Sequence, residues 1–238
     1  MGFTFIPFMS HLNDPAKVFV VIPAFNEQAV IRKVLTELIP FHYSIVVVDD
    51  GSTAELKELI EDLPVYLLRH RVNLGQGAAL QTGIEFSLSK GADYIITFDA
   101  DGQHRAADIA GLLSPLENKE ADIALGSRFL QDSSHIPARR KRLLKMARLA
   151  NYIFTGLLLT DAHNGLRALT ATAASQVRLR QPGMAHATEI ISIIRKKGLR
   201  YKEVPVTIVY TDYSKNKGQT IWSGFRIFFD ILLNKIFK

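Results

Sequence analysis

Two aspartates near the middle of the chain, Asp99 and Asp101, could share one divalent cation. They follow the run YIITF at 94–98, which has no charge and predicts a strand buried on both faces. Two carboxylates that are two residues apart on extended backbone point the same way. Mg²⁺ and Mn²⁺ prefer such oxygen ligands and commonly bridge them to substrate phosphates. The alternative is a polar turn that ends a strand, since Asp and Gly are ordinary turn residues.

Other polar residues follow apolar runs in the same way. Runs at 18–22, 45–48, 65–68, 94–98 and 123–125 predict buried strands. Helical spacing between the first four predicts an α/β fold, a mostly parallel open sheet with helices on both faces. Ligands of such sheets bind outside the carboxyl ends of the strands.

Three polar clusters fall at that predicted edge of the sheet. They are Asn26 with Glu27, Asp49 with Asp50, and Asp99 with Asp101. Three polar strand ends at one edge favour a ligand site over three unrelated turns.

Composition limits the class of protein. The 238 residues suit one large α/β domain. The absence of cysteine excludes a disulfide scaffold, a Cys-based zinc site and thiol catalysis. The formal net charge of +6 agrees with anionic partners, such as nucleotides, phospholipid surfaces or nucleic acid.

The loops exclude several nucleotide-binding classes. The loop at 23–27, PAFNE, has no glycine where a dinucleotide oxidoreductase would carry G-x-G-x-x-G. Gly75 and Gly77 imitate that motif, but Leu80 stands where its third glycine would be. There is no P-loop and no recognisable nucleic-acid-binding module, so we expect no nucleic-acid partner. Carboxylates without a glycine-rich phosphate loop are suited to a metal-bound diphosphate.

Two segments suggest contact with a membrane. The stretch at 139–159 starts with basic residues and continues with apolar ones. It is either a membrane-surface helix or a helix with a solvated basic face that packs on the sheet. The helix predicted from Ile221 to Phe237 is apolar around most of its circumference, so we expect it to meet a membrane or a partner protein; the alternative is packing on the core of the same chain. No run reaches about 18 apolar residues without charge, so no transmembrane helix is predicted.

Six short motifs stand in order along the chain. They are PAFNE at 23–27, VVDDGS at 47–52, N-x-G-x-G at 73–77, DADGQH at 99–104, GSR at 126–128 and D-x-x-N-G-x-R at 161–167. In this order they resemble a family 2 glycosyltransferase with the GT-A fold, close to the dolichol-phosphate mannosyltransferase-like branch.

The resemblance implies a division of the chain. A GT-A-type Rossmann-like domain would cover 17–212, after an N-terminal leader at 1–16 that is either mobile or a small anchor. A basic loop and a C-terminal amphipathic helical extension would occupy 213–238.

The resemblance also implies site residues. Asp99, Asp101 and Gln103 would form the metal side, with Mg²⁺ or Mn²⁺ as the cofactor. The nucleotide-sugar pocket would be lined by Pro23, Ala24, Asn26, Glu27, Asp50, Gly75, Gln76, Asp99, Ala100 and Asp101.

Catalytic candidates are Asp101, Arg128, Asp161, Arg167 and Glu189. The resemblance implies that both arginines face the acceptor phosphate or the donor diphosphate, since a planar guanidinium suits phosphate oxygens. The alternative for each arginine is a surface salt bridge. Asp161 and Glu189 could take a proton from a hydroxyl acceptor. Their alternatives are a turn aspartate and a glutamate that stabilises a helix N-terminus.

The expected function is inverting transfer of a sugar from a nucleotide-diphosphate donor to a polyprenyl phosphate or another cell-envelope glycan or lipid. A phosphate acceptor is already an anion near neutral pH and needs no strong base. Two alternatives stay open: a sugar hydroxyl acceptor in polysaccharide synthesis, and a non-catalytic membrane-peripheral subunit that binds nucleotide sugars. We expect a cytoplasmic protein, peripheral at the cytoplasmic face of the membrane, and a homo-oligomer is compatible with the sequence.

Overall fold

The computed structural model describes residues 16–130, 149, 152, 156–181 and 185–209. Predictions for other parts of the chain lie outside these residues: nearly all of the leader at 1–16, the basic stretch at 139–148, and the loop and helix at 213–238.

One seven-stranded sheet forms the centre of the described chain, with the strand order β3-β2-β1-β4-β6-β5-β7. The strands are β1 (Val18–Ala24), β2 (Ser44–Asp49), β3 (Val65–Arg69), β4 (Tyr94–Thr97), β5 (Ile123–Ser127), β6 (Arg167–Thr170) and β7 (Tyr201–Pro205). Every neighbouring pair is parallel except the two that β6 forms with β4 and β5. The mostly parallel sheet predicted from the sequence is confirmed.

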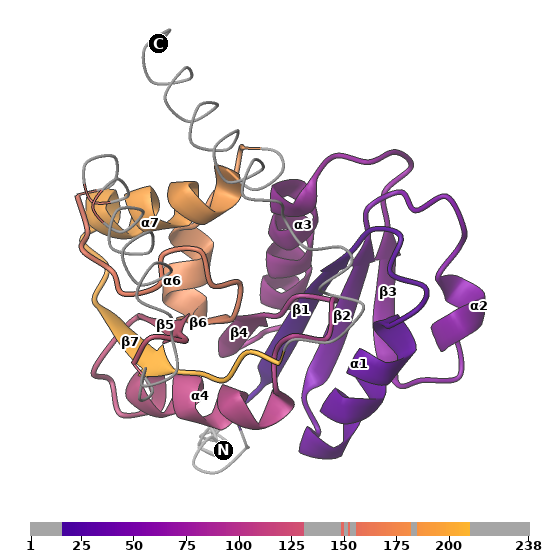
Figure 1. Cartoon of the computed structure of the whole chain (residues 1–238), viewed down its shortest axis with the longest axis horizontal. Helices are drawn as coiled ribbons and strands as arrows, with labels where there is room; N and C mark the ends of the chain where they lie inside the picture. Colours follow the sequence, from indigo (N-terminus) through magenta and orange to yellow (C-terminus); the bar gives the residue numbers. More distant parts are fainter. Residues whose placement is uncertain (1–15, 131–148, 150–151, 153–155, 182–184, 210–238) are drawn as a thin grey trace, which may run out of the picture.

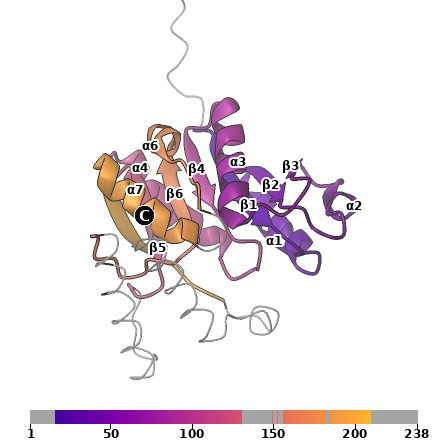
Figure 2. The ribbon, with the colours of Figure 1, turned by 90° about the horizontal axis from the view of Figure 1, so that it is seen from above.

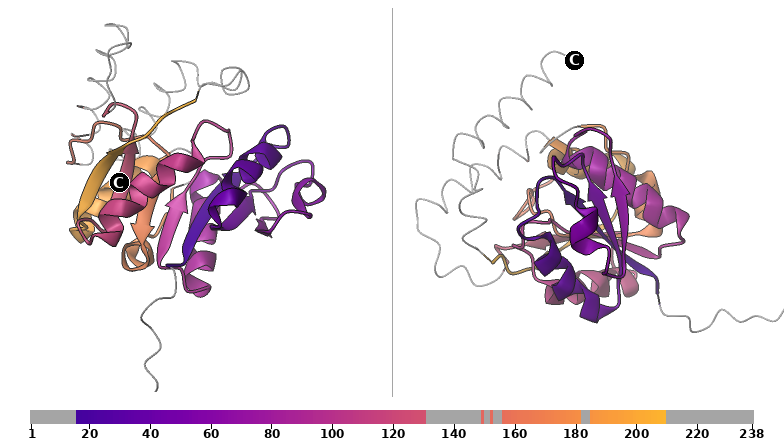
Figure 3. Two further views of the ribbon diagram at one scale, coloured as in Figure 1. Left: turned by 90° about the horizontal axis from the view of Figure 1, so that it is seen from below. Right: turned by 90° about the vertical axis from the view of Figure 1, so that its right-hand side faces the viewer.

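Helices cover both faces of this sheet (Figure 1). They are α1 (Ile31–Leu38), α2 (Lys57–Ile60), α3 (Gln76–Ser89), α4 (Ile109–Glu117), α6 (Ala171–Gln176) and α7 (His186–Lys197), with 3₁₀ turns at Ile39–Phe41 and Ala106–Asp108. The first face carries α1, α2 and α4, and the second carries α3, α6 and α7. Figures 2 and 3 show the same two layers from other directions.

Alternation along the strands explains why the central strands β1, β2 and β4 are almost unbroken apolar runs. In β1, Val20 and Ile22 pack into the core under α1 and α4, whereas Phe19 and Val21 pack into the core under α3 and α7. Successive side chains of a strand point to opposite faces, so a strand covered on both faces needs an unbroken apolar run. Each fully buried Val or Ile contributes about 1.5–3 kcal/mol relative to exposure.

The short strand β6 was not predicted. Arg167 begins it, and its four residues follow a polar loop that the sequence pattern left without a strand. Because β6 is antiparallel, its first residue lies at the same edge as the last residues of its neighbours. Arg167 pairs with Thr97 at the end of β4 and with Leu125 of β5. The sheet edge therefore gathers the ends of six strands and the beginning of one.

Replacing Gly83 by alanine is expected to destabilise the fold, because α3 packs very closely on β1 at this position. A Cβ atom at Gly83 would lie 2.2 Å from Val21 Cγ1 in the core. Overpacking of this kind costs about 1–3 kcal/mol. Urea unfolding of Gly83→Ala should therefore give a lower free energy of unfolding.

Gly111→Ala in α4 is the matched control. A Cβ atom there would lie 3.6 Å from Val204 Cγ1, which is ordinary van der Waals contact. Alanine at a compatible helical position stabilises by about 0.5–1 kcal/mol. We expect opposite signs for the two variants, and a stable Gly83→Ala protein would contradict the close packing of α3 on β1.

Candidate active site

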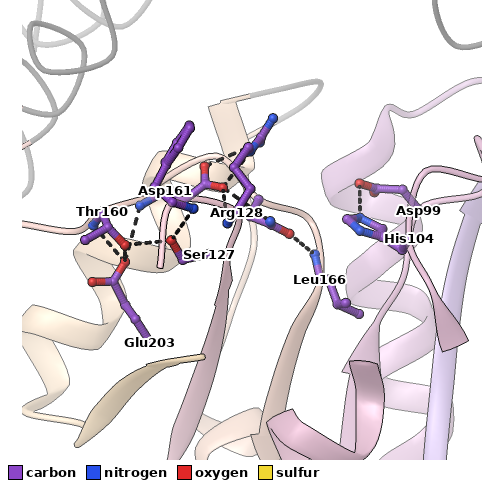
Figure 4. Close-up of polar contacts among 10 residues, drawn as sticks. Asp99, His104, Ser127, Arg128, Thr160, Asp161, Leu166 and Glu203 are labelled. Carbon is purple, nitrogen blue, oxygen red and sulfur yellow. Dashed lines mark hydrogen bonds and ion pairs between the residues drawn. The ribbon is translucent and has the colours of Figure 1, made fainter. Parts of the chain in front are cut away.

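Asp99 is held by side chains from two different segments. Its Oδ1 accepts a hydrogen bond of 2.9 Å from Gln76 Nε2 at the start of α3. Its Oδ2 lies 3.1 Å from His104 Nε2 (Figure 4). The Asp99 side chain keeps 28% of its surface exposed, so it remains open to a ligand.

The loop before β6 closes directly on this carboxylate. A Cβ atom at Gly165 would lie 2.0 Å from Asp99 Oδ2, so only glycine allows the approach. Thr97 Oγ1 fixes the loop by donating a hydrogen bond of 2.6 Å to the Gly165 carbonyl oxygen. Two motifs far apart in the sequence, DADGQH and D-x-x-N-G-x-R, thus meet at one point.

The two predicted metal ligands differ in their tendency to ionise. Burial disfavours the charge of Asp99, but the hydrogen bond from His104 and the charges of His104, Arg167 and His186 outweigh it, so the pKa of Asp99 is lowered. Burial, followed by the nearby charge of Asp99, raises the pKa of Asp101.

These carboxylates fit a small divalent cation. The charge of Asp99 opposes the ionisation of Asp101, and a cation bound between the two carboxylates would remove this repulsion. Asp101 Oδ1 also accepts a hydrogen bond of 3.0 Å from the Gln103 backbone nitrogen, which fixes the turn. Within the described ranges, no group of three or more His, Cys, Asp or Glu side chains could enclose a metal. Mg²⁺ is commonly held by one or two carboxylates together with substrate phosphates and water.

His104 supports the Asp99 carboxylate from a buried position. It is 5% exposed and meets the Phe98 ring edge-on at a centroid distance of 5.4 Å. Its Nδ1 is buried without a hydrogen-bond partner. The residues behind it are also tied down, because the backbone of His104 bridges to Ile208 and the Gln103 carbonyl accepts a hydrogen bond of 2.8 Å from Val209.

Arg167 is a buried cation whose terminal nitrogens have no partner. It is 2% exposed, and neither Nη1 nor Nη2 is hydrogen-bonded to any residue that the structure describes. Burial lowers its pKa to about 10, against the opposing effects of Asp99 and Asp161. The surface salt bridge considered as an alternative for Arg167 does not match this burial. Open donors on a planar guanidinium suit a phosphate ligand.

Arg128 is oriented by Asp161. Its Nε donates to Asp161 Oδ2 at 2.6 Å, its Nη2 donates to Oδ1 at 3.3 Å, and its backbone nitrogen donates to Oδ2 at 3.2 Å. Asn164 Nδ2 donates a further hydrogen bond of 3.3 Å to Asp161 Oδ2. Asp161 is therefore engaged with Arg128, and its role as a general base stays a prediction.

Glu189, the other candidate base, is engaged with backbone. It lies in the first turn of α7, and its carboxylate accepts hydrogen bonds from the backbone nitrogens of Arg180 and Gln181 at 2.9 Å each. These contacts fix the segment after α6. A proton-accepting role for Glu189 also stays a prediction.

The predicted nucleotide side consists of interlocked loops after β1 and β2. Pro23 and Ala24 are buried at the end of β1, and Ala100 and Glu27 are also buried. Asn26 has a left-handed backbone with φ of 57°, and its Oδ1 accepts hydrogen bonds of 3.0 Å from the Thr53 backbone nitrogen and hydroxyl. This bond joins the first loop to the second.

Asp50 organises the third loop. Its Oδ1 accepts a 2.9 Å hydrogen bond from the Leu74 backbone nitrogen, and its Oδ2 accepts one of 2.8 Å from that of Gly75. His70 Nδ1 lies 2.8 Å from Oδ1. The buried Asp50 side chain is thus taken up by hydrogen bonds to the turn at Leu74 and Gly75. This turn places Gln76 against Asp99. The place of Asp50 in the nucleotide-sugar pocket, against the base or the ribose, stays a prediction.

Asp49 belongs to a polar cluster that the sequence placed at this edge of the sheet, although it was not among the candidate site residues. It is the last residue of β2, and its buried Oδ2 has no hydrogen-bond partner in the described part of the chain, although it forms an ion pair with Arg69 Nε at 3.5 Å. Its Oδ1 accepts a hydrogen bond of 2.9 Å from the Ser52 backbone nitrogen. The adjacent pair Asp49 and Asp50 was the available signal in the sequence. Only the fold shows that both Asp50 oxygens accept hydrogen bonds and that Asp49 Oδ2 does not.

Comparisons with known proteins agree with this geometry. A model described as glycosyl transferase family 2 matches residues 19–178. The chain is 37% identical over 240 residues to an uncharacterized protein of Methanocaldococcus jannaschii, with 96% of this chain and 97% of that protein covered. It is 30% identical over 243 residues to the UDP-N-acetylglucosamine–dolichyl-phosphate N-acetylglucosaminyltransferase of Methanococcus voltae, with 93% of this chain and 97% of that protein covered.

A solved structure supports the architecture. The mannosyl-3-phosphoglycerate synthase of Rubrobacter xylanophilus has a TM-score of 0.69 at 16% identity, with 91% of this chain and 72% of that chain covered. This likeness concerns the fold alone and confirms the expected GT-A-type architecture. The matched residues include all six motifs found in the sequence. The chain therefore belongs to glycosyl transferase family 2, and its Methanococcus voltae relative supports the dolichol-phosphate branch that the motifs indicated.

Proposed function

We propose that this protein transfers a sugar, with inversion, from a nucleotide diphosphate to a polyprenyl phosphate. The observation that carries the proposal is the buried guanidinium of Arg167 beside the carboxylate pair, because its terminal nitrogens have no hydrogen-bond partner among the described residues. The name of the Methanococcus voltae relative, a dolichyl-phosphate N-acetylglucosaminyltransferase, supports the same pairing of donor and acceptor.

On the donor side, Asp99 and Asp101 would hold Mg²⁺ or Mn²⁺. When bound, such a cation would neutralise the diphosphate and act as a Lewis acid for the leaving group. The chain's own part is orientation: Gln76 and His104 fix Asp99, and the Gln103 backbone fixes Asp101. Held carboxylates need no rearrangement at the moment of reaction, which is the basis of electrostatic preorganisation.

On the acceptor side, Arg167 and Arg128 would bind the phosphate. A guanidinium pairs strongly with phosphate oxygens, and two cations would offset the repulsion between an anionic acceptor and an anionic donor. The phosphate oxygen is a nucleophile without proton removal. This agrees with the contacts of Asp161 and Glu189, whose carboxylates are engaged with Arg128 and with backbone nitrogens.

A lipid phosphate requires access to a membrane surface. Among the residues that the structure describes, no helix is both long enough and apolar enough to cross a bilayer. We propose peripheral attachment at the cytoplasmic face through the predicted helix from Ile221 to Phe237, which lies outside the described residues. Flotation of the full chain with anionic liposomes measures this attachment directly.

The proposed reaction is tested with purified protein, labelled nucleotide sugars, polyprenyl phosphate and Mn²⁺. We expect a lipid-linked sugar, complete loss with EDTA and recovery with added Mn²⁺ or Mg²⁺. Asp101→Asn should lower kcat/KM by at least ~100-fold, because it removes charge from the proposed metal site. The folded state should persist by circular dichroism.

Asp122→Asn is the matched control. Asp122 pairs with Arg200 on the surface at the opposite end of β5, so its loss should leave transfer unchanged. Transfer that survives EDTA would overturn the metal assignment. Transfer to a sugar hydroxyl or to unphosphorylated polyprenol, with none to polyprenyl phosphate, would overturn the acceptor.

Arg167→Met should separate activity from stability. Removing the Arg167 guanidinium relieves its cost of desolvation but leaves Asp99 and Asp161 without a nearby counter-charge. These two effects oppose each other, so we expect a melting temperature close to that of the unaltered protein. Transfer should fall by at least ~100-fold, because a charge-assisted contact with phosphate is lost.

Arg200→Met should give the reverse pattern. Arg200 forms an exposed ion pair with Asp122, so its loss should lower the melting temperature slightly and leave kcat/KM intact. If Arg167→Met were fully active, or lost activity only through unfolding, Arg167 would have no role in phosphate binding.

A further inference from the structure

Glu203 lies outside every motif, yet it makes a dense set of contacts near the site. It sits on the edge strand β7, and its Oε1 accepts hydrogen bonds from Thr160 Oγ1 at 2.6 Å, from the Thr160 backbone nitrogen at 2.7 Å and from the Asp161 backbone nitrogen at 3.2 Å (Figure 4). One partly buried carboxylate oxygen therefore fixes the turn at residues 160–161.

The direction of these bonds follows from the donors available. The single hydroxyl proton of Thr160 goes to Glu203, because an ionised carboxylate can only accept. Ser127 Oγ, 2.7 Å from Thr160 Oγ1, must then donate to Thr160, and it accepts a 3.2 Å hydrogen bond from the Phe129 backbone nitrogen. The chain of bonds runs from the backbone around Arg128 to the carboxylate of Glu203.

The turn that Glu203 fixes also carries Asp161, which forms an ion pair with Arg128. Asp161 accepts hydrogen bonds from the side chain and the backbone nitrogen of Arg128. Arg128 is thus tied to Glu203 by two routes, through Ser127 and Thr160 and through Asp161. Both routes pass through the turn that Glu203 anchors.

We propose that Glu203 is a positioning residue, which sets the direction of the Arg128 guanidinium toward the acceptor phosphate. The proposal rests on the proposed function in one respect, the binding of phosphate by Arg128. It extends the site to β7, a strand whose residues contribute no predicted ligand.

The kinetic test uses three variants. Glu203→Leu removes the acceptor for all three hydrogen bonds, Glu203→Gln keeps an oxygen acceptor of the same reach, and Glu120→Gln breaks only the exposed ion pair with Lys202 of the same strand. For Glu203→Leu we expect kcat/KM for polyprenyl phosphate to fall by about 10–100-fold, as for a small misplacement of a binding group. Affinity for the nucleotide diphosphate with Mn²⁺ should not change.

Glu203→Gln should recover most of the activity, and Glu120→Gln should behave as the unaltered protein. Thr160→Val, which removes one hydroxyl without changing shape, should give an intermediate loss and replaces Glu203→Leu if that variant does not fold. A parallel fall in nucleotide affinity would overturn the positioning role, because the defect would then not be confined to the acceptor side.

A double-mutant cycle distinguishes positioning from general structural support. If Glu203 acts through Arg128, then Glu203→Leu should cost little further activity in an Arg128→Ala background. Additive losses would overturn the proposal.

Hydrogen exchange tests the anchor independently of catalysis. Glu203→Leu should speed exchange of the Thr160, Asp161 and Arg128 amides, whose acceptors it removes or loosens, and Glu120→Gln should not. If the unaltered protein transferred no sugar to polyprenyl phosphate, the proposed function would fail, and exchange at the Arg128 amide would still decide the anchor. Unchanged exchange there would overturn it.

Discussion

The contact of Asp99 with the loop before β6 is the constraint on which the site depends. The backbone at Gly165 leaves no room for a side chain beside the Asp99 carboxylate, while Gln76 and His104 hold that carboxylate from the other sides. Because three separate segments converge on one side chain, the proposed donor half and the proposed acceptor half have a fixed relation. A shift in any of the three would move both halves of the site.

Mutual compensation of charge explains how Arg167 can be buried beside Asp99 and Asp161. A buried guanidinium such as Arg167 is costly to desolvate, and its lowered pKa reflects that cost. The carboxylates of Asp99 and Asp161 offset part of it, and Arg167 in turn helps to keep Asp99 ionised. The balance is incomplete, since Asp101 has a raised pKa and the terminal nitrogens of Arg167 lack partners. A cation bound at Asp101 and an anion bound at Arg167 would complete the balance of charge.

Much of the parallel half of the fold was predictable, because its signals are local. Unbroken apolar runs and the polar residues after them indicated β1, β2 and β4, and the structure brings their carboxyl ends to one edge. The strand β6 was missed because its sequence, RALT, begins with a charged residue and ends with a polar one, so it contains no apolar run. The burial of Arg167, the open oxygen of Asp49 and the anchoring role of Glu203 depend on contacts between distant segments, such as the bond from Thr97 to Gly165, 68 residues later.

The antiparallel insertion of β6 explains how a sheet edge can carry two kinds of site. Parallel strands present only their carboxyl ends there, and the loops of this chain fill that edge with carboxylates. The reversed strand presents its first residue instead, so Arg167 enters between Thr97 and Leu125 with its charge beside Asp99. The guanidinium at the start of β6 and the carboxylates of the loop after β4 are then held a short distance apart. That arrangement suits a reaction in which two anionic substrates must be brought together, since Arg167 would attract one anion and a cation held by the carboxylates would attract the other.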